Sequence, residues 1–176
     1  MDISRIHNHP AGIALAAHYD TSEDRPGEFE KFVAISVALT GFSEAELRST
    51  GLVRTYFDEM ALIIGRTIRG DFLDAVAGDP ANALKLDPWR PLGQNLVRMW
   101  YVGQWKAMPP GWATTNFAEP DGSGATQPPP GYNEFGRDTT RVLSAAGYQE
   151  GLVWRAIGVN PPGAKQPGFA SWARGL

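Results

Sequence analysis

The chain of 176 residues contains no cysteine. This absence excludes disulfide bonds, thiolate metal sites, iron–sulfur clusters and a cysteine nucleophile. Charge of one sign is also scarce, because the formal net charge is only −3. No basic stripe points to nucleic acid or to an anionic membrane as a partner.

Long apolar runs are missing as well. No stretch approaches 18 consecutive apolar residues, so we expect no segment to span a bilayer. The apolar run at 13–17 is too short for the central region of a signal peptide. As it stands, the chain carries no export signal, which predicts a cytoplasmic protein.

The remaining composition is that of a globular protein, with 43% hydrophobic and 20% charged residues. Its length suits a single domain with its own hydrophobic core. Alternating apolar and polar runs bounded by turns are absent, so no strand is predicted. We therefore expect an all-α domain of about four to five helices with long Pro/Gly-rich irregular arms. Its predicted parts are an N-terminal arm (1–27), a helical core (28–105), a long loop (106–137), a helix (138–157) and a C-terminal arm (158–176).

Helix signals are clearest within the predicted core. A helix is predicted over 28–40, with acidic residues in its first turn and Gly41 as its stop. Ser43 and Glu46 have the spacing of a capping box, which predicts a second helix. Thr50-Gly51 predicts a break or kink after it.

Two further helices are expected before the long loop. Apolar residues recur at three-to-four spacing over 52–76, which predicts an amphipathic helix. Gly65 and Gly70 inside it allow a bend or a close helix approach. Asp87 and Pro88 have the pattern of a cap followed by proline at the first helical position, so the next helix is predicted to begin there.

Aromatic residues concentrate where this last helix meets the long loop. Four of the six tryptophans fall between 89 and 112. Such density indicates a buried hub, an interface with a partner, or both. The predicted interface residues are Trp100, Tyr101, Trp105, Trp112, Phe117, Phe169 and Trp172. The alternative is that Trp100, Tyr101 and Trp105 fill the chain's own core, whereas the interface is favoured for Trp112, Phe169 and Trp172.

No catalytic, cofactor-binding or metal-binding residues are predicted. His7 and His9 could face one side of an extended segment, but a third metal ligand is not evident. Glu59 is expected to be a surface or salt-bridged carboxylate rather than a buried acid. The arginines at 66, 69, 98, 141 and 155 are expected to pair with acids or to extend toward solvent.

Three segments of the chain resemble motifs of a known family. The segment 32–41 looks like a Phe-x-x-x-Ser-x-x-Leu-Thr-Gly helix. The segment 95–103 ends in Trp-Tyr-Val-Gly, similar to a Trp-Tyr-(Ser/Thr)-Gly motif. The third comprises Tyr-Gln-Glu-Gly-Leu-Val-Trp at 148–154, Pro-Pro-Gly at 161–163 and Gln-Pro-Gly-Phe-Ala-Ser-Trp at 166–172. Together they resemble the small (gamma) subunit of bacterial membrane-associated FAD-dependent sugar and polyol dehydrogenases, the sorbitol, fructose and glucoside 3-dehydrogenase type.

The resemblance implies a heteromeric complex. A large flavin subunit of the glucose–methanol–choline (GMC) oxidoreductase type would pass a hydride from a sugar hydroxyl to FAD, and a cytochrome subunit often takes the electrons onward. The small subunit would bind no cofactor and would stabilise and help mature the large one. Small subunits of this kind commonly carry a twin-arginine export signal, which does not precede Phe32 here. Removal of such a signal would instead place the protein in the periplasm.

Residue pattern and resemblance agree on a chain whose aromatic arms are covered by a larger partner, through an interface above about 2,000 Å². One rival hypothesis is a stand-alone carbohydrate-binding domain, in which the loop 106–137 is a lid and Trp105 and Trp112 stack on a sugar. Another is a folding chaperone that leaves the mature enzyme.

Overall fold

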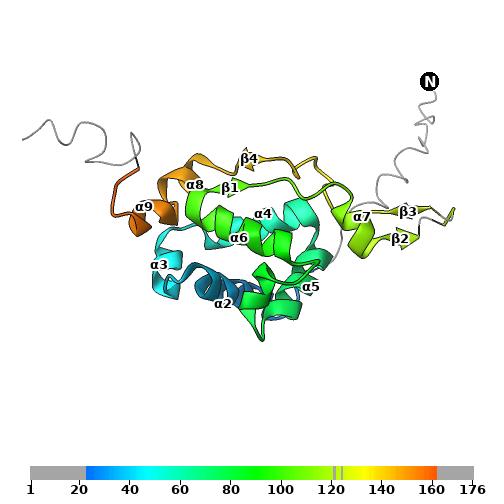
Figure 1. The fold of residues 1–176 in the computed structure, drawn as a ribbon, viewed down its shortest axis with the longest axis horizontal. Helices are drawn as coiled ribbons and strands as arrows, with labels where there is room; N and C mark the ends of the chain where they lie inside the picture. The colour runs from blue at the N-terminus through cyan, green and yellow to red at the C-terminus, as the bar shows by residue number, and fades with distance from the viewer. Residues whose placement is uncertain (1–22, 121, 124, 162–176) are drawn as a thin grey trace, which may run out of the picture.

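A computed structural model describes residues 23–161 except 121 and 124. This part is mostly helical (Figure 1). The α-helices are α2 (Glu28–Thr40), α3 (Glu44–Ser49), α4 (Val53–Ile64), α5 (Arg66–Val76), α6 (Arg90–Val102), α7 (Trp112–Phe117), α8 (Ala145–Gln149) and α9 (Leu152–Ala156), with a 3-10 helix η1 (Pro80–Leu84) before α6. The expectation of a mostly helical small domain is confirmed.

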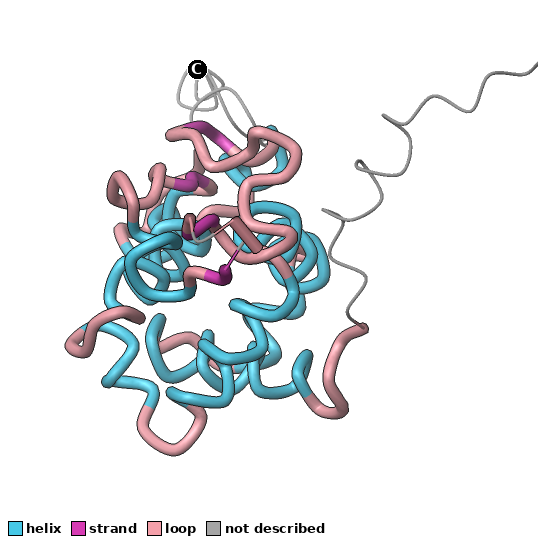
Figure 2. The backbone as a smooth tube through the Cα atoms, turned by 90° about the vertical axis from the view of Figure 1, so that its right-hand side faces the viewer, coloured by secondary structure: helices cyan, strands magenta, loops and turns pink. Residues whose placement is uncertain are grey.

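The expectation that the chain has no strands is wrong. Four two-residue strands occur, namely β1 (Gln104–Trp105), β2 (Glu119–Pro120), β3 (Thr126–Gln127) and β4 (Arg141–Val142). They form two antiparallel ribbons, β1 with β4 and β2 with β3. Figure 2 shows the strands within the half of the molecule that also holds most of the loops. Strands this short leave no periodic signal in a sequence, because alternation needs at least four residues to register.

The first two helices form as their sequence predicts. α2 covers 28–40 and ends at Gly41, whose φ of 76° is in the left-handed region. Ser43 accepts a hydrogen bond from the Glu46 backbone N–H, and the Glu46 side chain accepts one from the Ser43 backbone N–H, which completes the predicted capping box. The predicted break follows, since α3 ends at Ser49 and α4 begins at Val53.

The predicted helix over 52–76 is divided in two. Gly65 separates α4 from α5 with φ 82° and ψ 152°, a conformation that L side chains rarely adopt. The two resulting helices pack against each other, and α5 also packs against α2. Of the two outcomes expected for Gly65 and Gly70, the bend therefore occurs at Gly65.

The predicted start of the next helix is two residues too early. Asp87 and Pro88 lie in a turn joined by a cis peptide bond, and α6 begins at Arg90 with Pro91 in its first turn. α6 then runs through the middle of the molecule and contacts α2, η1, β1, α8 and α9 (Figure 1). Its central position makes it the element around which the rest of the fold is arranged.

The segments after α6 are more structured than expected. The predicted loop 106–137 contains α7 and the β2–β3 ribbon, which lie at one end of the long axis (Figure 1). The predicted single helix over 138–157 consists of β4 and the two short helices α8 and α9, and these two helices lie at the other end. Only 23–27 and 158–161 of the two predicted arms fall within the described residues.

The core is continuous from α2 to α9. Its fully buried side chains include Phe32, Tyr56, Phe57, Met60, Phe72, Leu96, Trp100, Trp105 and Leu152. Aromatic rings meet edge to face in it, as for Phe32 with Phe57 and for Tyr56 with Trp100 at a centroid distance of 5.0 Å. The described part of the chain thus buries many of its large aromatic residues without a partner.

Candidate functional site

The described parts of the three segments that carry the sequence resemblance meet at one junction. The Tyr101 hydroxyl at the end of α6 donates a hydrogen bond to the Thr40 carbonyl at the end of α2, 2.9 Å away. Gly103 lies against Gly147 of α8, where a Cβ would stand only 2.4 Å from the Gly147 carbonyl carbon. Gly151, between α8 and α9, lies equally close to the Tyr101 carbonyl, which a Cβ would approach to 2.7 Å.

Most of the predicted interface tryptophans are internal. Trp100 is 1% exposed and Trp105 is 0% exposed, so the alternative that they fill the chain's own core describes their positions. Trp112 was expected to face a partner, but it is 6% exposed and its Nε1 donates to the Pro88 carbonyl, 3.0 Å away. Phe117 and Tyr132 pack against this ring.

The remaining predicted interface residues occupy less enclosed positions. Tyr101 and Phe117 are half-buried, with Tyr101 packed on Phe42 and Phe117 between Trp89 and Trp112. Phe169 and Trp172 lie outside the described residues, as do His7 and His9.

Asp138 organises the region between the aromatic residues and the long loop, and sequence reasoning missed it. Its Oδ1 accepts hydrogen bonds from Trp105 Nε1 and from the Met108 backbone N–H, both at 2.9 Å. Its Oδ2 accepts one from the Tyr132 hydroxyl at 2.6 Å. Burial, and then the bond to Asp138, raises the pKa of the Tyr132 phenol. The order of residues along the chain gives no sign that these groups converge.

Two separate groups of ion pairs hold Glu59 and Arg69 in place. The Glu59 carboxylate is 17% exposed and receives Arg137 and Arg141 at 2.9 and 3.0 Å, which confirms the expectation of a salt-bridged glutamate. Arg69 is 1% exposed and pairs with the equally buried Glu28 at 3.1 Å. Its guanidinium also lies 3.7 Å from the centre of the Phe57 ring.

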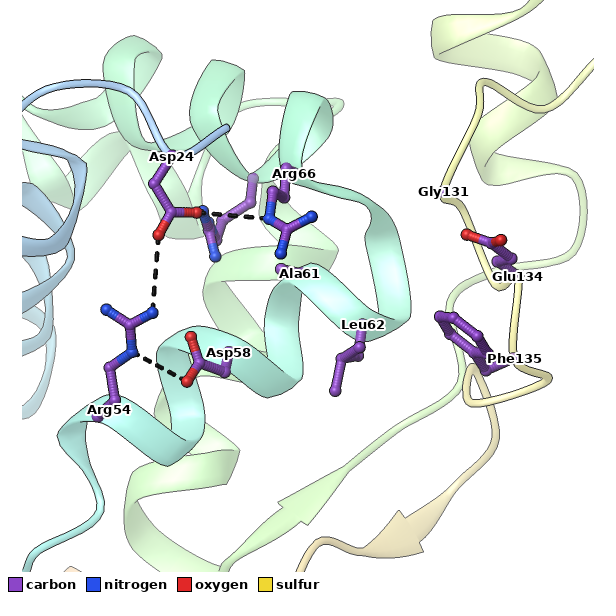
Figure 3. Close-up of a pocket in the computed structure, with 10 residues that line it drawn as sticks. Asp24, Arg54, Asp58, Ala61, Leu62, Arg66, Gly131, Glu134 and Phe135 are labelled. Carbon is purple, nitrogen blue, oxygen red and sulfur yellow. Dashed lines mark hydrogen bonds and ion pairs between the residues drawn. The ribbon is translucent and has the colours of Figure 1, made fainter. Parts of the chain in front are cut away.

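A pocket of about 350 Å³ opens beside Arg69 (Figure 3). Asp24 lies between Arg54 and Arg66, and Arg54 also donates to Asp58 at 2.9 Å. Glu134 and Phe135 approach from the loop across the pocket (Figure 3). Its lining holds three carboxylates and three guanidinium groups, so the charges neutralise one another and no net attraction for an anion or a cation results.

A broader groove of about 1,040 Å³ follows the outer side of α6. Its other wall is the segment 106–110, which Asn95 holds in place: Asn95 Nδ2 donates to the Lys106 carbonyl at 2.9 Å, and its Oδ1 accepts from the Lys106 N–H at 2.8 Å. The lining carries three cations, Arg90, Arg98 and Lys106, and no carboxylate. Its apolar part includes Leu84, Pro91, Val97, Val102, Met108, Pro109 and Pro110.

The described residues show neither a cluster of metal ligands nor a membrane-spanning helix. Within 23–161, apart from 121 and 124, no three His, Cys, Asp or Glu side chains are grouped so that they could hold a metal ion. None of the helices described there combines the length and apolar character needed to cross a bilayer. Comparison of the chain with protein-family models, with curated proteins and with solved structures gives no match.

Proposed function

We propose that this chain is a non-catalytic small subunit that stabilises and helps mature a large FAD-dependent, GMC-type dehydrogenase subunit, which oxidises a hydroxyl of a sugar or glycoside. The proposal starts from the three segments that resemble the gamma subunits of such complexes. In this division of labour the large subunit binds FAD and accepts the hydride, and the small subunit supplies surface.

The observation that carries the proposal is the convergence of those segments. They are separated by more than 40 residues in sequence, yet all three meet at Tyr101, whose hydroxyl donates to the Thr40 carbonyl and whose own carbonyl lies against Gly151. A chance likeness of three short motifs has no reason to select residues in mutual contact. The described parts of the resemblance therefore lie in one compact structural unit, which supports the proposal.

The surface of the domain also suits a subunit of a larger assembly. Several large apolar side chains are about half exposed or more, namely Leu86, Phe135, Val142, Ile157 and Val159. A partner that covers such side chains gains hydrophobic free energy from each of them. Single exposed apolar residues are common on monomers, so these add to the argument from the junction and do not replace it.

The rival carbohydrate-binding domain requires open aromatic faces. Trp105 and Trp112, the two rings assigned to sugar stacking, are 0% and 6% exposed. Stacking on a sugar needs one full face of the ring to be open. The rival would therefore need the segment after α6 to move away from the core before any sugar could bind.

Purification of the tagged chain from its native host tests the proposal. We expect a yellow complex whose visible spectrum shows flavin, and in which mass spectrometry finds a GMC-type flavoprotein in near-equal amount. A colourless, well-folded monomer that binds a sugar alone would overturn the proposal in favour of the rival domain.

A further inference from the structure

The groove along α6 differs from the other pocket in its charge. The pocket beside Arg69 balances three carboxylates against three guanidinium groups, whereas the groove has cations only. Arg90 is paired with Asp87 at 3.1 Å. Among residues 23–161, apart from the two gaps, the side chains of Arg98 and Lys106 have neither a hydrogen bond nor an ion pair. Both residues are exposed.

Two of the three uncharged polar side chains that line the groove are already used by the protein. Asn95, which is 4% exposed, spends both its amide oxygen and its amide nitrogen on the backbone of Lys106. The Thr140 hydroxyl accepts from the Ala107 N–H at 3.0 Å. A small polar ligand is recognised by a few convergent unpaired donors and acceptors, and these two side chains, the best placed to supply them, are committed.

We therefore expect an occupant to be recognised mainly by apolar area and by charge, as a protein segment is. Pro91, Val97, Val102 and Met108 supply the apolar area. Arg98 and Lys106 supply unneutralised positive charge beside it. The complementary partner is a segment that presents apolar side chains to the groove and carboxylates to its edge.

We infer that the α6 groove is a docking site for an acidic amphipathic segment of the large flavin subunit, with Arg98 and Lys106 as its specificity-determining residues. The inference rests on the proposed function, because that function supplies the partner. The groove is lined by part of the second resemblance segment, from Asn95 to Val102. It adds which face of the small subunit is covered and by what chemistry.

Charge reversal tests the electrostatic part. The double variant Arg98→Glu/Lys106→Glu keeps the Asn95 tether, and we expect it to weaken binding of the flavoprotein by at least about tenfold. The dissociation constant should also depend less steeply on salt concentration in the double variant than in the wild type. Arg155→Glu is the matched control, since Arg155 is an exposed helical arginine that does not line the groove. Its guanidinium donates to the Ser49 hydroxyl of α3 at 3.2 Å.

Photo-crosslinking tests the identity of the occupant. A photoreactive phenylalanine analogue at Gln94, which is exposed and lines the groove, should attach to one peptide of the flavoprotein rich in Asp or Glu. The same analogue at Ala156, exposed on α9, should not attach to that peptide. Circular dichroism of each variant separates lost binding from lost folding.

The outcomes distinguish this inference from the proposed function. A flavoprotein complex that forms equally well with the wild type, the double variant and the control leaves the small-subunit function intact and overturns the groove assignment. A crosslink from Gln94 to a second copy of this chain, or to a peptide without acidic residues, overturns it as well. If the wild type binds no flavoprotein at all, both the inference and the proposed function fail.

Discussion

Tyr56 shows how a single buried hydroxyl can work against stability. Its ring packs edge to face on Trp100, but its hydroxyl has no hydrogen-bond partner within the described part of the chain. Burial raises the pKa of this phenol above its ordinary value near 10. The neutral phenol is thus favoured more strongly in the folded state than in the unfolded state. Ionisation of this group therefore leaves the free energy of unfolding unchanged below pH 10 and lowers it as the pH rises past that value.

We therefore predict that Tyr56→Phe leaves the free energy of unfolding at pH 7 unchanged or raises it by about 1 kcal/mol. The loss of stability above about pH 10 should be shallower in the variant. Urea unfolding at a series of pH values measures both effects. Tyr132→Phe is the control, because that hydroxyl donates to Asp138 and its removal should cost about 1–3 kcal/mol. A loss at pH 7 as large as that of the control would contradict the prediction.

Gly103 is the residue on which the junction depends most. Its φ of 65° and the 2.4 Å approach to Gly147 both disfavour a side chain. We predict that Gly103→Ala lowers the free energy of unfolding by about 3 kcal/mol or more, because conformational strain and overpacking add. Gly41→Ala shares the positive φ but meets nothing within 4 Å, so it should lose only about 1–2 kcal/mol. Equal losses in the two variants would show that the close contact has no energetic weight.

At the scale of elements, the buried pair of Arg69 and Glu28 links α5 to α2. Removing one partner leaves a buried, uncompensated charge. We predict that Arg69→Met lowers the free energy of unfolding by about 3–5 kcal/mol, and that adding Glu28→Gln restores part of it. Arg48→Met removes an exposed pair with Glu44 and should cost less than about 1 kcal/mol. Thermal and urea unfolding of the four proteins decide this, and a loss for Arg69→Met no larger than that for Arg48→Met would refute it.

The wall of the α6 groove rests on Asn95. Asn95→Ala removes both hydrogen bonds to Lys106, so the segment 106–108 should open locally while α6 stays folded. We expect hydrogen exchange of the Lys106 amide to accelerate at least about tenfold, the equivalent of one lost hydrogen bond. Gln94→Ala, exposed on the same helix, should leave that amide unchanged. Unaltered protection in Asn95→Ala would mean that other contacts hold the wall.

The elements with local signals were predictable and those made by distant contacts were not. Gly41 as a stop and the Ser43 capping box act within one turn of helix, so their sequence suffices. The helix break at Gly65 was ambiguous, because a glycine inside a periodic pattern permits either a bend or continuity. Asp138, which joins residues 30 positions apart, has no local signature at all.

The candidate site was less predictable than the fold. Aromatic density signals burial but does not say whether the covering surface is the chain's own or a partner's, and Trp100, Trp105 and Trp112 are covered by their own chain. The α6 groove depends on which cations remain unpaired after folding. Whether a cation is paired depends on tertiary packing, so the sequence alone does not distinguish Arg98, which is unpaired among the described residues, from the paired Arg69.

For the whole molecule, the described residues form a packed core with the candidate groove outside it. The aromatic residues pack α6 into this core, and the outer side of α6 carries the groove. A preformed surface lowers the entropic cost of association, since less has to be ordered on binding. In the proposed complex, such a preformed surface is what the small subunit would contribute to the folding of the large one.

The most direct test of the proposed function is to express the flavin subunit that co-purifies with this chain, with and without the chain. The subunit expressed together with it should be soluble, should contain stoichiometric FAD and should oxidise its sugar. The subunit expressed alone should be insoluble or free of flavin. Equal yield, FAD content and activity in the absence of this chain would contradict its role as a stabilising and maturing subunit.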